Sequence, residues 1–568
     1  MNLLDWIILI GTLVSIAMYG VWKGRGSKDM KGYLLSNNDM KWHTVAFSIM
    51  ATQASAITFL STPGQAYIDG MRFVQFYLGL PIAMVVLSVT AVPLYYKLKV
   101  YTAYEYLESH FDLKTRALAA FLFLIQRGLA AGLTIYAPSI ILSVLLGWNI
   151  YWTNLFIGGI VIIYTATGGS RAVGWTQFQQ MIIILLGMFA AFFMIIHLLP
   201  DHVSFLDSVK VAGKLGKLNA IDFSFNLDNK YSIWSGIIGG FFLQMSYFGT
   251  DQSQVQRYLT GETVKQSRLG LLFNGIVKVP MQFGILFIGA MLFVFYQFVA
   301  PPLFFNPVET QKVKTSVHAE QYNNLENQFH QLFAEKKDKL NSMVQAMDSK
   351  NESEVASLQN DINSTNDKIK HLRTEAAGVI AKNDPLADTN DTNYIFLSFV
   401  LKYLPAGLIG LVLAAIFAAS MSSTASEINS LASTTIVDVY KRMIKKDASD
   451  RHYLIASKLA TVLWGLFAIA FAAFVSQLGT LIEAVNILGS LFYGTILGIF
   501  LLAFYFKKVN ATPAFLAAIV AEIVVICCFF FTEISFLWYN LIGCLLVILL
   551  AHIIDSFIKK GNTTKTNL

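Results

Sequence analysis

The chain has 568 residues, of which 55% are hydrophobic and only 14% are charged, and this composition excludes an ordinary soluble protein of that length. The formal net charge is +7. The basic residues nevertheless lie in short segments between apolar runs, a pattern typical of membrane proteins and not of nucleic-acid-binding ones. We therefore expect a lipid bilayer and no nucleic acid among the partners.

Apolar runs long enough to cross about 30 Å of hydrocarbon as helices recur along almost the whole chain. The first run lacks a basic segment before it and a cleavage site after it, so we interpret it as a retained helix and not as a signal peptide. The pattern predicts an all-α integral membrane protein with about 13 transmembrane helices. Their expected ranges are 3–22, 44–68, 72–97, 117–147, 150–167, 173–199, 232–250, 268–299, 404–437, 452–477, 479–506, 511–531 and 534–556.

The distribution of lysine and arginine predicts the orientation in the membrane. The loop after the first helix and the segments 97–116 and 441–446 are basic, and helix parity places all three on one side. Short basic loops remain in the cytoplasm. We therefore expect a multi-pass protein of the plasma membrane, of the bacterial inner membrane type, with its N-terminus outside and its C-terminus in the cytoplasm.

One long stretch, 301–393, is too polar to lie in lipid. Its apolar residues recur at spacings of three, four and seven, and a polar break at 348–353 divides it in two. This pattern predicts an antiparallel helical hairpin, and parity places the hairpin outside the cell. An inserted spacer without chemistry and an arm that docks an extracytoplasmic partner through 310–385 are both open interpretations.

Two polar windows at membrane depth indicate where an ion and a solute could bind. The first, 51–64, is rich in Thr, Ser, Pro and Gly and predicts a helix that unwinds; unwound backbone survives in hydrocarbon only where it lines a cavity or binds a cation. The second, 418–430, places Ala419 and Ser423 one helical turn apart, and hydroxyl and carbonyl oxygens suit a hard cation. Small-residue packing between helices is the alternative for both windows.

Four windows, in this order along the chain, resemble the sodium:solute symporter family. They are Tyr101-Thr-Ala-Tyr-Glu-Tyr-Leu-Glu108, Gly168-Gly-Ser-Arg-Ala-Val-Gly-Trp-Thr-Gln-Phe-Gln179, Asp251-Gln-Ser-Gln-Val-Gln-Arg257, and Ser422-Ser through Asp438-Val-Tyr-Lys441. Two further stretches, Pro63-Gly-Gln-Ala-Tyr67 and Tyr136-Ala-Pro-Ser139, resemble the branch with iodide, multivitamin and monocarboxylate symporters. The resemblance implies a 5+5 inverted-repeat core of the leucine-transporter type and symport of sodium with a small organic solute by alternating access, not an enzymatic reaction.

The resemblance also implies a sodium site within the two polar windows. Family positions that bind sodium through carbonyl and hydroxyl oxygens match Ala51, Ala54, Ala419, Ser422 and Ser423. Some members hold a second sodium with an aspartate, but this chain has Gln177 at that position and Ala425 in place of a hydroxyl. A neutral amide cannot supply the missing charge, so we favour a single sodium ion as the co-transported ion.

For the solute, the resemblance implies a cavity lined by Thr58, Gln244, Tyr247, Lys278 and Asn486, with Tyr247 as the inner gate. Sugar-transporting members carry a glutamine at the position of Thr58 and a glutamate near Tyr77. The absence of that carboxylate removes repulsion against an anion and favours an organic anion such as a monocarboxylate, a vitamin or a sugar acid. A sodium-coupled sugar symporter is the alternative, and a membrane solute sensor without transport is a distant one.

Each of these site residues also has a structural interpretation. Gln244 and Asn486 could form hydrogen bonds between helices, and Tyr247 could be part of the packed core. Arg127 and Lys278 are costly charges at membrane depth; Arg127 could attract an anionic substrate or pair with a carboxylate, and Lys278 could reach the membrane surface.

These predictions divide the chain into seven parts. They are an extra N-terminal helix and loop (1–43), a first repeat (44–199), an extracellular loop (200–231), the first part of the second repeat (232–300), the polar insertion (301–393), the second part of that repeat (394–506), and two C-terminal helices with a tail (507–568).

Overall fold

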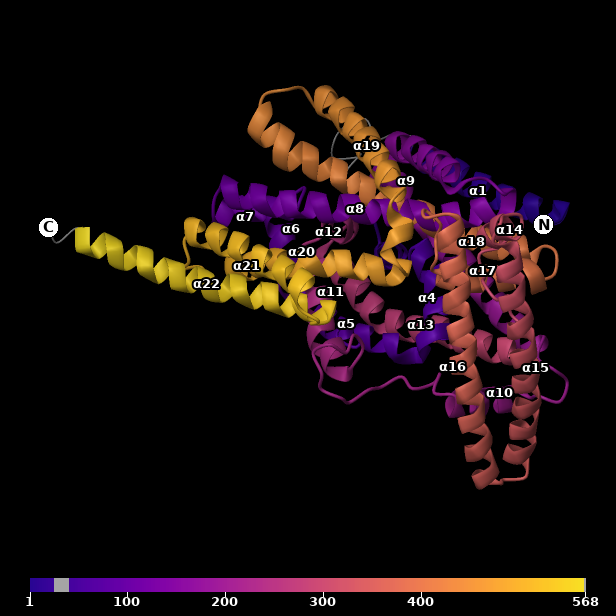
Figure 1. Cartoon of the computed structure of the whole chain (residues 1–568). Coiled ribbons are helices and arrows are strands. Elements are labelled where there is room, and N and C mark those ends of the chain that lie inside the picture. The colour runs from indigo at the N-terminus through magenta and orange to yellow at the C-terminus, as the bar shows by residue number, and fades with distance from the viewer. Residues whose placement is uncertain (25–39, 566–568) are drawn as a thin grey trace.

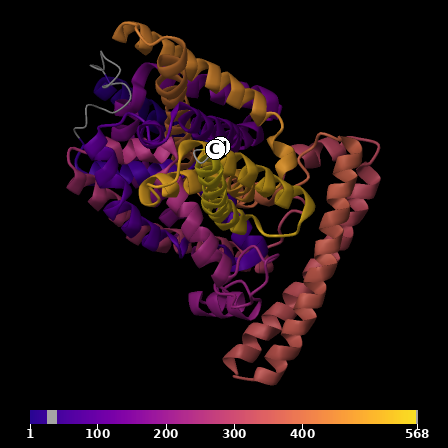
Figure 2. The same ribbon diagram turned by 90° about the vertical axis from the view of Figure 1, so that its left-hand side faces the viewer.

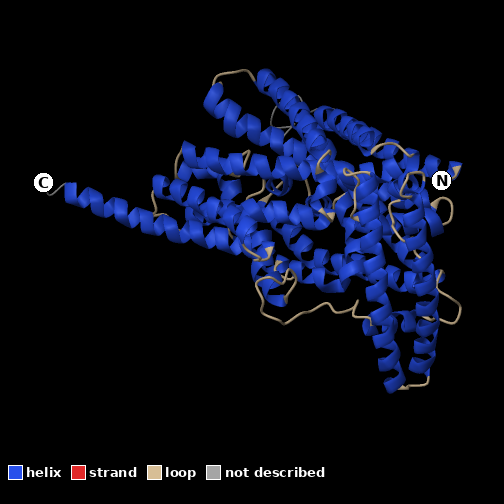
Figure 3. Ribbon diagram, in the orientation of Figure 1, coloured by secondary structure: helices blue, strands red, loops and turns tan. Residues whose placement is uncertain are grey.

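The computed structural model describes residues 1–24 and 40–565, and these are almost entirely helical (Figure 3). Within those ranges the only strand-like feature is an isolated bridge between Met40 and Gly261. Part of the predicted basic loop, residues 25–39, lies outside the described residues. The structure is therefore an all-helical bundle, as the composition predicts.

The first part of the bundle runs from the N-terminus to α9 (Figure 1). It contains α1 (Leu3–Gly24), α3 (Trp42–Gln53), α4 (Ala56–Asp69), the 3-10 helix η2 (Gly70–Tyr77), α5 (Leu80–Val89), α6 (Ala91–Leu98), α7 (Tyr104–His110), α8 (Leu113–Leu146) and α9 (Ile150–His197). Helix α9 joins the two spans expected at 150–167 and 173–199. Its 48 residues correspond to about 72 Å of helix. The first of the two spans was expected to end at residue 167, but the helix continues through the Gly-Gly-Ser sequence at 168–170.

The second part begins after α10 (Phe205–Lys214) and contains most of the remaining membrane helices. These are η3 (Ser235–Gly239), α11 (Gly240–Gly249), α12 (Gln252–Leu259), α13 (Val264–Phe298), η4 (Asp391–Tyr394), α17 (Ile395–Tyr403), α18 (Leu408–Thr434) continued by η5 (Thr435–Ile444), α19 (Asp450–Ala472), η6 (Val475–Leu478), α20 (Leu481–Tyr505), α21 (Ala511–Phe531) and α22 (Phe536–Lys565).

Nine helical stretches of the described chain are long and apolar enough to cross a membrane. Two shorter apolar helices, Leu3–Ile16 and Ile150–Ile163, add to them. One of the nine, Ala56–Leu98, is 43 residues long and includes parts of two expected helices. A membrane protein with several spanning helices is therefore established, whereas the total of about thirteen stays a prediction.

The break predicted in the first polar window is present between α3 and α4. Helix α3 ends at Gln53, Ala54 leaves the helical conformation with φ −86° and ψ 72°, and Ser55 is extended before α4 begins. Pro63 does not interrupt α4. Gly64, next to it, allows a close approach, because a Cβ there would lie 2.1 Å from the carbonyl oxygen of Thr392.

A second break separates α11 from α12 at Thr250 and Asp251. The expected range 232–250 ends at this point, but the continuation of the chain as α12 was not predicted. Asp251 caps the new helix by accepting a hydrogen bond from the backbone N–H of Ser253 at 2.8 Å. The segment contains no proline, so nothing local forces the chain out of helix. Two interrupted helices therefore lie within the bundle.

The polar insertion forms a hairpin of α15 (Ala319–Asp348) and α16 (Glu352–Asn383), preceded by α14 (Pro307–Lys314). The two long helices lie side by side and extend away from the bundle as a rod (Figures 1 and 2). The turn between them falls within the predicted break at 348–353. An ion pair between Arg373 and Asp391, with N···O 2.7 Å, fixes the base of the rod.

The hairpin and the N-terminus lie at one end of the bundle, and the C-terminus lies at the other (Figure 1). Two basic segments are linked by a shared acidic side chain, because Arg116 and Arg442 both form ion pairs with Glu108. Arg116 also pairs with Asp438 at 2.7 Å. The segments that parity places on one side, 97–116 and 441–446, are therefore in direct contact.

Candidate functional site

An internal cavity lies beside the break between α3 and α4. Its lining comes from both ends of that break and from η2, α8, α11, α18 and α20. The space that a water-sized sphere can occupy in this cavity is about 80 Å³, so the cavity is small in this structure. Because the lining side chains include arginine, glutamate, three glutamines and several hydroxyls, as well as apolar residues, the site suits a small polar solute.

The predicted sodium positions lie next to this cavity. The hydroxyl of Ser422 on α18 is 3.5 Å from the carbonyl oxygen of Ala51. The hydroxyl of Ser423 donates to the carbonyl of Ala419 at 3.0 Å, one turn earlier on α18. All three residues on α18 and both Ala51 and Ala54 are at most 1% exposed. The structure therefore brings the broken helix and the serine helix together at buried oxygens.

The end of α3 supplies the electrostatic reason for a cation there. The last carbonyl groups of a helix lack partners within the helix and carry the negative end of its dipole. Ala54 is the C-cap of α3, and its N–H bonds the carbonyl of Met50. Of the carbonyls that follow Met50, that of Ala51 lies 3.5 Å from the hydroxyl of Ser422 on α18.

Gln177 lies at the centre of a neighbouring polar cluster. Its amide nitrogen donates to the hydroxyls of Thr52 at 3.0 Å and Ser426 at 3.1 Å, and its amide oxygen accepts from the hydroxyl of Ser48. All four side chains are buried or nearly so. The Gln177 amide is therefore hydrogen-bonded to all three hydroxyls of this cluster.

Four of the five predicted substrate residues line the cavity: Thr58, Gln244, Tyr247 and Asn486. Both amide atoms of Gln244 are buried and have no hydrogen-bond partner among the described residues. The amide nitrogen of Asn486 bonds the carbonyl of Ile482 in its own helix at 2.7 Å, and the hydroxyl of Tyr247 accepts from Gln254 at 2.7 Å. The interhelical hydrogen bonds that would make Gln244 purely structural are therefore not seen.

Lys278 is not brought to the cavity lining. It is fully buried on α13, and within the described chain its ammonium has no hydrogen-bond partner. That ammonium lies 5.9 Å from the ring centroid of Tyr77, whose side chain does line the cavity. Lys278 therefore sits behind Tyr77 and would reach a solute only if that ring moved.

Arg127 is held in a buried ion-pair cluster at the cavity wall. Its guanidinium pairs with Asp251 at the second helix break and, at 3.1 Å, with Glu427 of α18. Tyr493 donates to Asp251 at 2.9 Å, and Thr134 donates to Glu427 at 2.8 Å. Of the two interpretations of Arg127, pairing with carboxylates is the one that the structure shows.

Asp251, Glu427 and Tyr493 are not among the site residues predicted from the sequence. Asp251 was quoted within a family window and Glu427 lies inside the second polar window, but neither was weighed as a charge. The cost of an unpaired charge at membrane depth was the available signal. One buried arginine requires buried carboxylates, and Asp251 in the family window and Glu427 in the second polar window were candidates.

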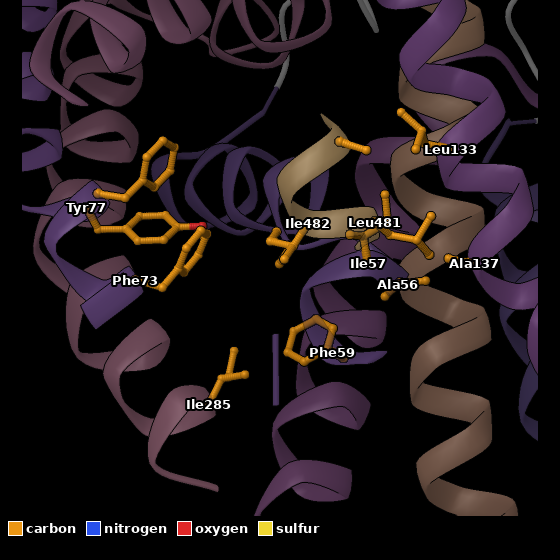
Figure 4. Close-up of a cluster of buried hydrophobic side chains, with 14 of the residues drawn as sticks. Ala56, Ile57, Phe59, Phe73, Tyr77, Leu133, Ala137, Ile285, Leu481 and Ile482 are labelled. Carbon is orange, nitrogen blue, oxygen red and sulfur yellow. The ribbon is translucent and has the colours of Figure 1, made fainter. Parts of the chain in front are cut away.

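On α20, the hydrophobic residues Ile482 and Val485 contribute to the cavity lining. Figure 4 shows Leu481 and Ile482 beside Ala56 and Ile57 at the start of α4. The backbone N–H of Ile482 also donates to the hydroxyl of Ser61 on α4 at 3.3 Å. The broken helix and α20 are therefore in contact next to the cavity.

Two interrupted helices around one internal polar cavity, in a bundle of apolar helices, define a membrane transporter for ions and small solutes. Discontinuous helices of this kind place unpaired backbone groups where a cargo binds and nowhere that lipid can reach.

Comparison with known proteins specifies the class further. The model of the sodium:solute symporter family matches residues 33–325 and 375–521. The chain belongs to this family and is a sodium-coupled secondary transporter of a small solute. The stretch between the two matched parts, 326–374, lies inside the hairpin.

Individual relatives resemble the chain over most of its length. The sodium-dependent multivitamin transporter of Oryctolagus cuniculus is 27% identical over 522 residues, which cover 90% of this chain and 68% of that protein. The sodium/sialic acid symporter SiaT of Proteus mirabilis (strain HI4320) is 24% identical over 552 residues, with 96% and 93% covered. A solved substrate-bound, outward-open structure of a Na+-coupled sialic acid symporter superimposes with a TM-score of 0.75 at 22% identity and covers 98% of both chains.

Proposed function

We propose that this protein carries a small organic anion into the cell together with one sodium ion, and that a monocarboxylate, a vitamin or a sugar acid is the solute. The observation that carries the proposal is the break between α3 and α4, which has oppositely charged helix ends on its two sides. The end of α3 offers carbonyls to sodium, and the start of α4 offers N–H groups to an anion.

The sodium proposal rests on the oxygens gathered at the end of α3. The carbonyls of Ala51 and Ala54 and the oxygens of Ala419, Ser422 and Ser423 are the proposed ligands. Their support is the 3.5 Å approach of the Ser422 hydroxyl to the Ala51 carbonyl. Sodium bound there would hold α3 against α18, and by linkage the solute and the ion would each strengthen the binding of the other.

The anion proposal rests on the opposite side of the break. Ser55 is the N-cap of α4, and its side chain caps no N–H of the first turn. Ser55 and Thr58 both line the cavity, so a carboxylate could accept hydrogen bonds from that turn. The buried amide nitrogen of Gln244 offers another donor.

Two further glutamines favour a solute that also carries hydroxyl groups. The side-chain oxygens of Gln53 and Gln126 are buried, line the cavity and have no hydrogen-bond partner among the described residues. An unpaired buried acceptor costs about 1–3 kcal/mol, and a hydroxyl of the solute would satisfy it. Among organic anions these acceptors favour a sugar acid over a plain monocarboxylate.

A screen in proteoliposomes tests the proposed function. Uptake of radiolabelled pyruvate, pantothenate, sialic acid, gluconate and glucose would be measured with and without an inward sodium gradient. We expect sodium-dependent uptake of at least one of the anions and less than a tenth of that rate for glucose. Uptake of glucose alone would support the sugar symporter instead, and no sodium-dependent uptake of any solute would contradict the proposal.

We also propose two five-helix inverted repeats, 44–199 and 232–506, that alternate around the central cavity. The presence of one broken helix near the start of each supports this division. The contact between the basic segments at 97–116 and 441–446 supports a cytoplasmic position for that end. The N-terminus and the hairpin would then face outward, since they lie at the opposite end (Figure 1).

Sodium activation of uptake is expected to be hyperbolic, with a Hill coefficient of about 1. The reason is that the amide of Gln177 already occupies the polar cluster formed with Thr52 and Ser426, so no second cation is needed there. The measurement is the initial rate of uptake over a range of sodium concentrations at constant ionic strength. A Hill coefficient close to two would show that a second sodium is coupled.

Deletion of the hairpin is expected to leave sodium-dependent uptake in place. The base of the hairpin closes on itself, since the ammonium of Lys312 lies 3.4 Å from Asp384, and a short Gly-Ser linker can join residues 316 and 384. Uptake and its sodium dependence would be compared with those of the full chain in proteoliposomes, with surface expression as the control. Complete loss of uptake in a correctly inserted variant would mean that the hairpin is part of the transport machinery.

A further inference from the structure

The hairpin and the membrane bundle enclose a second cavity, separate from the central one. It is lined by α15 and α16 on one side and by the ends of α4 and α13 on the other. Exposed residues of α16 form its rim, so it is open to solvent. Several lining residues belong to 326–374, the stretch that the family model does not match. This cavity is therefore a feature of this chain's insertion and not of the shared transporter core.

Charges of both signs line this second cavity, with one more basic than acidic side chain. Four basic side chains line it, together with three aspartates: Lys217, Lys336, Lys370 and Arg373, with Asp69, Asp367 and Asp391. Arg373 is already paired with Asp391. Neither Lys336 nor Lys370 forms an ion pair with any residue of the described chain. Asp69, in the same lining, interacts electrostatically with Lys217 and Lys370, so Lys336 is the basic side chain of the lining that is least compensated by a carboxylate.

Lys336 is the most informative of these groups because it is buried. Lys336 is only 4% exposed, and its ammonium makes a single hydrogen bond, to the side-chain oxygen of Asn366 at 3.4 Å. Burial, reinforced by the nearby Arg373, lowers the pKa of the Lys336 ammonium to about 8. A buried ammonium without a counter-charge is costly, and an anion in the cavity would remove that cost.

Gln297 of α13 adds a second, independent indication of a ligand. It lines the same cavity, is 2% exposed, and its side-chain oxygen has no hydrogen-bond partner in the described part of the chain. Its amide nitrogen is occupied, since it donates to the carbonyl of Phe293 at 3.2 Å. The free atom is therefore an acceptor, and it requires a donor such as a hydroxyl.

We propose that this outer cavity is a binding site for a small organic anion that carries a hydroxyl group. The carboxylate would lie between Lys336 and Lys370, and the hydroxyl would donate to Gln297. The chemical class is that of the proposed solute, and to this extent the proposal rests on the proposed function. The sodium ligands belong to the central cavity, so binding in the outer cavity requires no sodium.

The test is equilibrium dialysis of the purified full-length protein in sodium-free choline chloride. The probes are radiolabelled lactate, glycerate and gluconate, with propionate and propane-1,2-diol as matched competitors that lack the hydroxyl or the charge of lactate. We expect at least one hydroxy acid to bind, and to bind at least tenfold more tightly than either competitor. If none of the three hydroxy acids binds without sodium, the proposal is wrong.

Substitutions locate the binding. Lys336→Met and, separately, Gln297→Leu are each expected to weaken hydroxy-acid binding at least tenfold. Lys368→Met is the matched control, because this exposed lysine of α16 does not line the cavity. Ser423→Ala, in the central site, should also leave binding unchanged. Unchanged binding in both cavity variants, or loss of binding in Ser423→Ala, would overturn the proposal.

Two further measurements are made on each variant. The first separates a loss of binding from a loss of folding, and the second separates the outer site from the proposed function. The unfolding temperature of each variant in detergent shows whether it is folded, and Gln297→Leu serves if Lys336→Met is not. Sodium-dependent uptake is measured on the same preparations. Failure of uptake with intact sodium-independent binding would contradict the proposed function alone, whereas the reverse result would contradict the outer site alone.

Discussion

Replacing Arg127 with methionine is expected to destabilise the protein by about 3–5 kcal/mol, because it leaves two buried carboxylates without their counter-charge. Arg127 is the shared partner of Asp251 and Glu427, and both acids are at most 4% exposed. The same change removes the contact between the second helix break and α18, so uptake should be lost as well. The loss of stability is measured by thermal unfolding in detergent and by the yield of folded protein.

A set of matched variants separates charge from size in this cluster. Arg72→Met removes a surface arginine whose nearest acid oxygen, on Asp222, is 3.6 Å away, and exposed pairs contribute about 0–1 kcal/mol. Glu427→Gln leaves Arg127 paired with Asp251 and should be milder than Arg127→Met. The combination of Arg127→Met with Asp251→Asn and Glu427→Gln should recover part of the lost stability. Equal destabilisation by Arg72→Met and Arg127→Met would contradict this explanation.

Replacing both Ser422 and Ser423 with alanine is expected to raise the sodium concentration for half-maximal uptake at least tenfold, equivalent to about 1.4 kcal/mol of lost ion binding. The two hydroxyls are the side-chain oxygens of α18 nearest to the proposed ion: one approaches the Ala51 carbonyl, and the other bonds the Ala419 carbonyl. The variant loses ligands but little volume, so its fold should persist. The measurement is the sodium dependence of initial uptake rates.

Ser430→Ala is the control for this pair. Ser430 is also fully buried on α18, but its hydroxyl donates to the carbonyl of Glu427 at 2.7 Å, two turns further along the helix. Its removal should leave the half-maximal sodium concentration within about twofold of the parent value, equivalent to about 0.4 kcal/mol. An equal rise in Ser430→Ala, or no rise in the double variant, would show that the ion binds elsewhere.

Much of the fold was predictable because the bilayer imposes strong rules on sequence. Apolar runs located most helices, and the polar window at 51–64 located the first break, which lies at Ala54 and Ser55. The end of α11 agrees with the expected range 232–250, but the continuation of the interrupted helix as α12 was not predicted. The second break depends on Asp251, whose partner Arg127 is 124 residues away along the chain, and no local pattern shows such a pairing.

Errors in the helix boundaries have physical causes as well. The expected ranges left a gap at 168–172, yet α9 continues through it, since small residues such as those of the Gly-Gly-Ser sequence are tolerated inside membrane helices. Pro63 was expected to contribute to the unwinding, but α4 continues through it. The glycine beside it serves close packing against Thr392 instead.

The candidate site was predictable only to the level of which segments meet. Four of the proposed substrate positions line one cavity, whereas Lys278 lies behind Tyr77. The position of Lys278 in the sequence predicts the face of α13 on which it lies, but it does not predict which side chain of a neighbouring segment packs against that face. The outer cavity could not be predicted at all, because it requires the hairpin to lie against α4 and α13.

The central claim is that the broken end of α3 and the serines of α18 together bind the sodium that drives transport. A density map of the protein prepared in sodium chloride, compared with one prepared in choline chloride, tests it most directly. We predict a peak present only with sodium, between the Ala51 carbonyl and the hydroxyls of Ser422 and Ser423. A continuous helix through Ala54 and Ser55, or a sodium-dependent peak elsewhere with none at this position, would contradict the account.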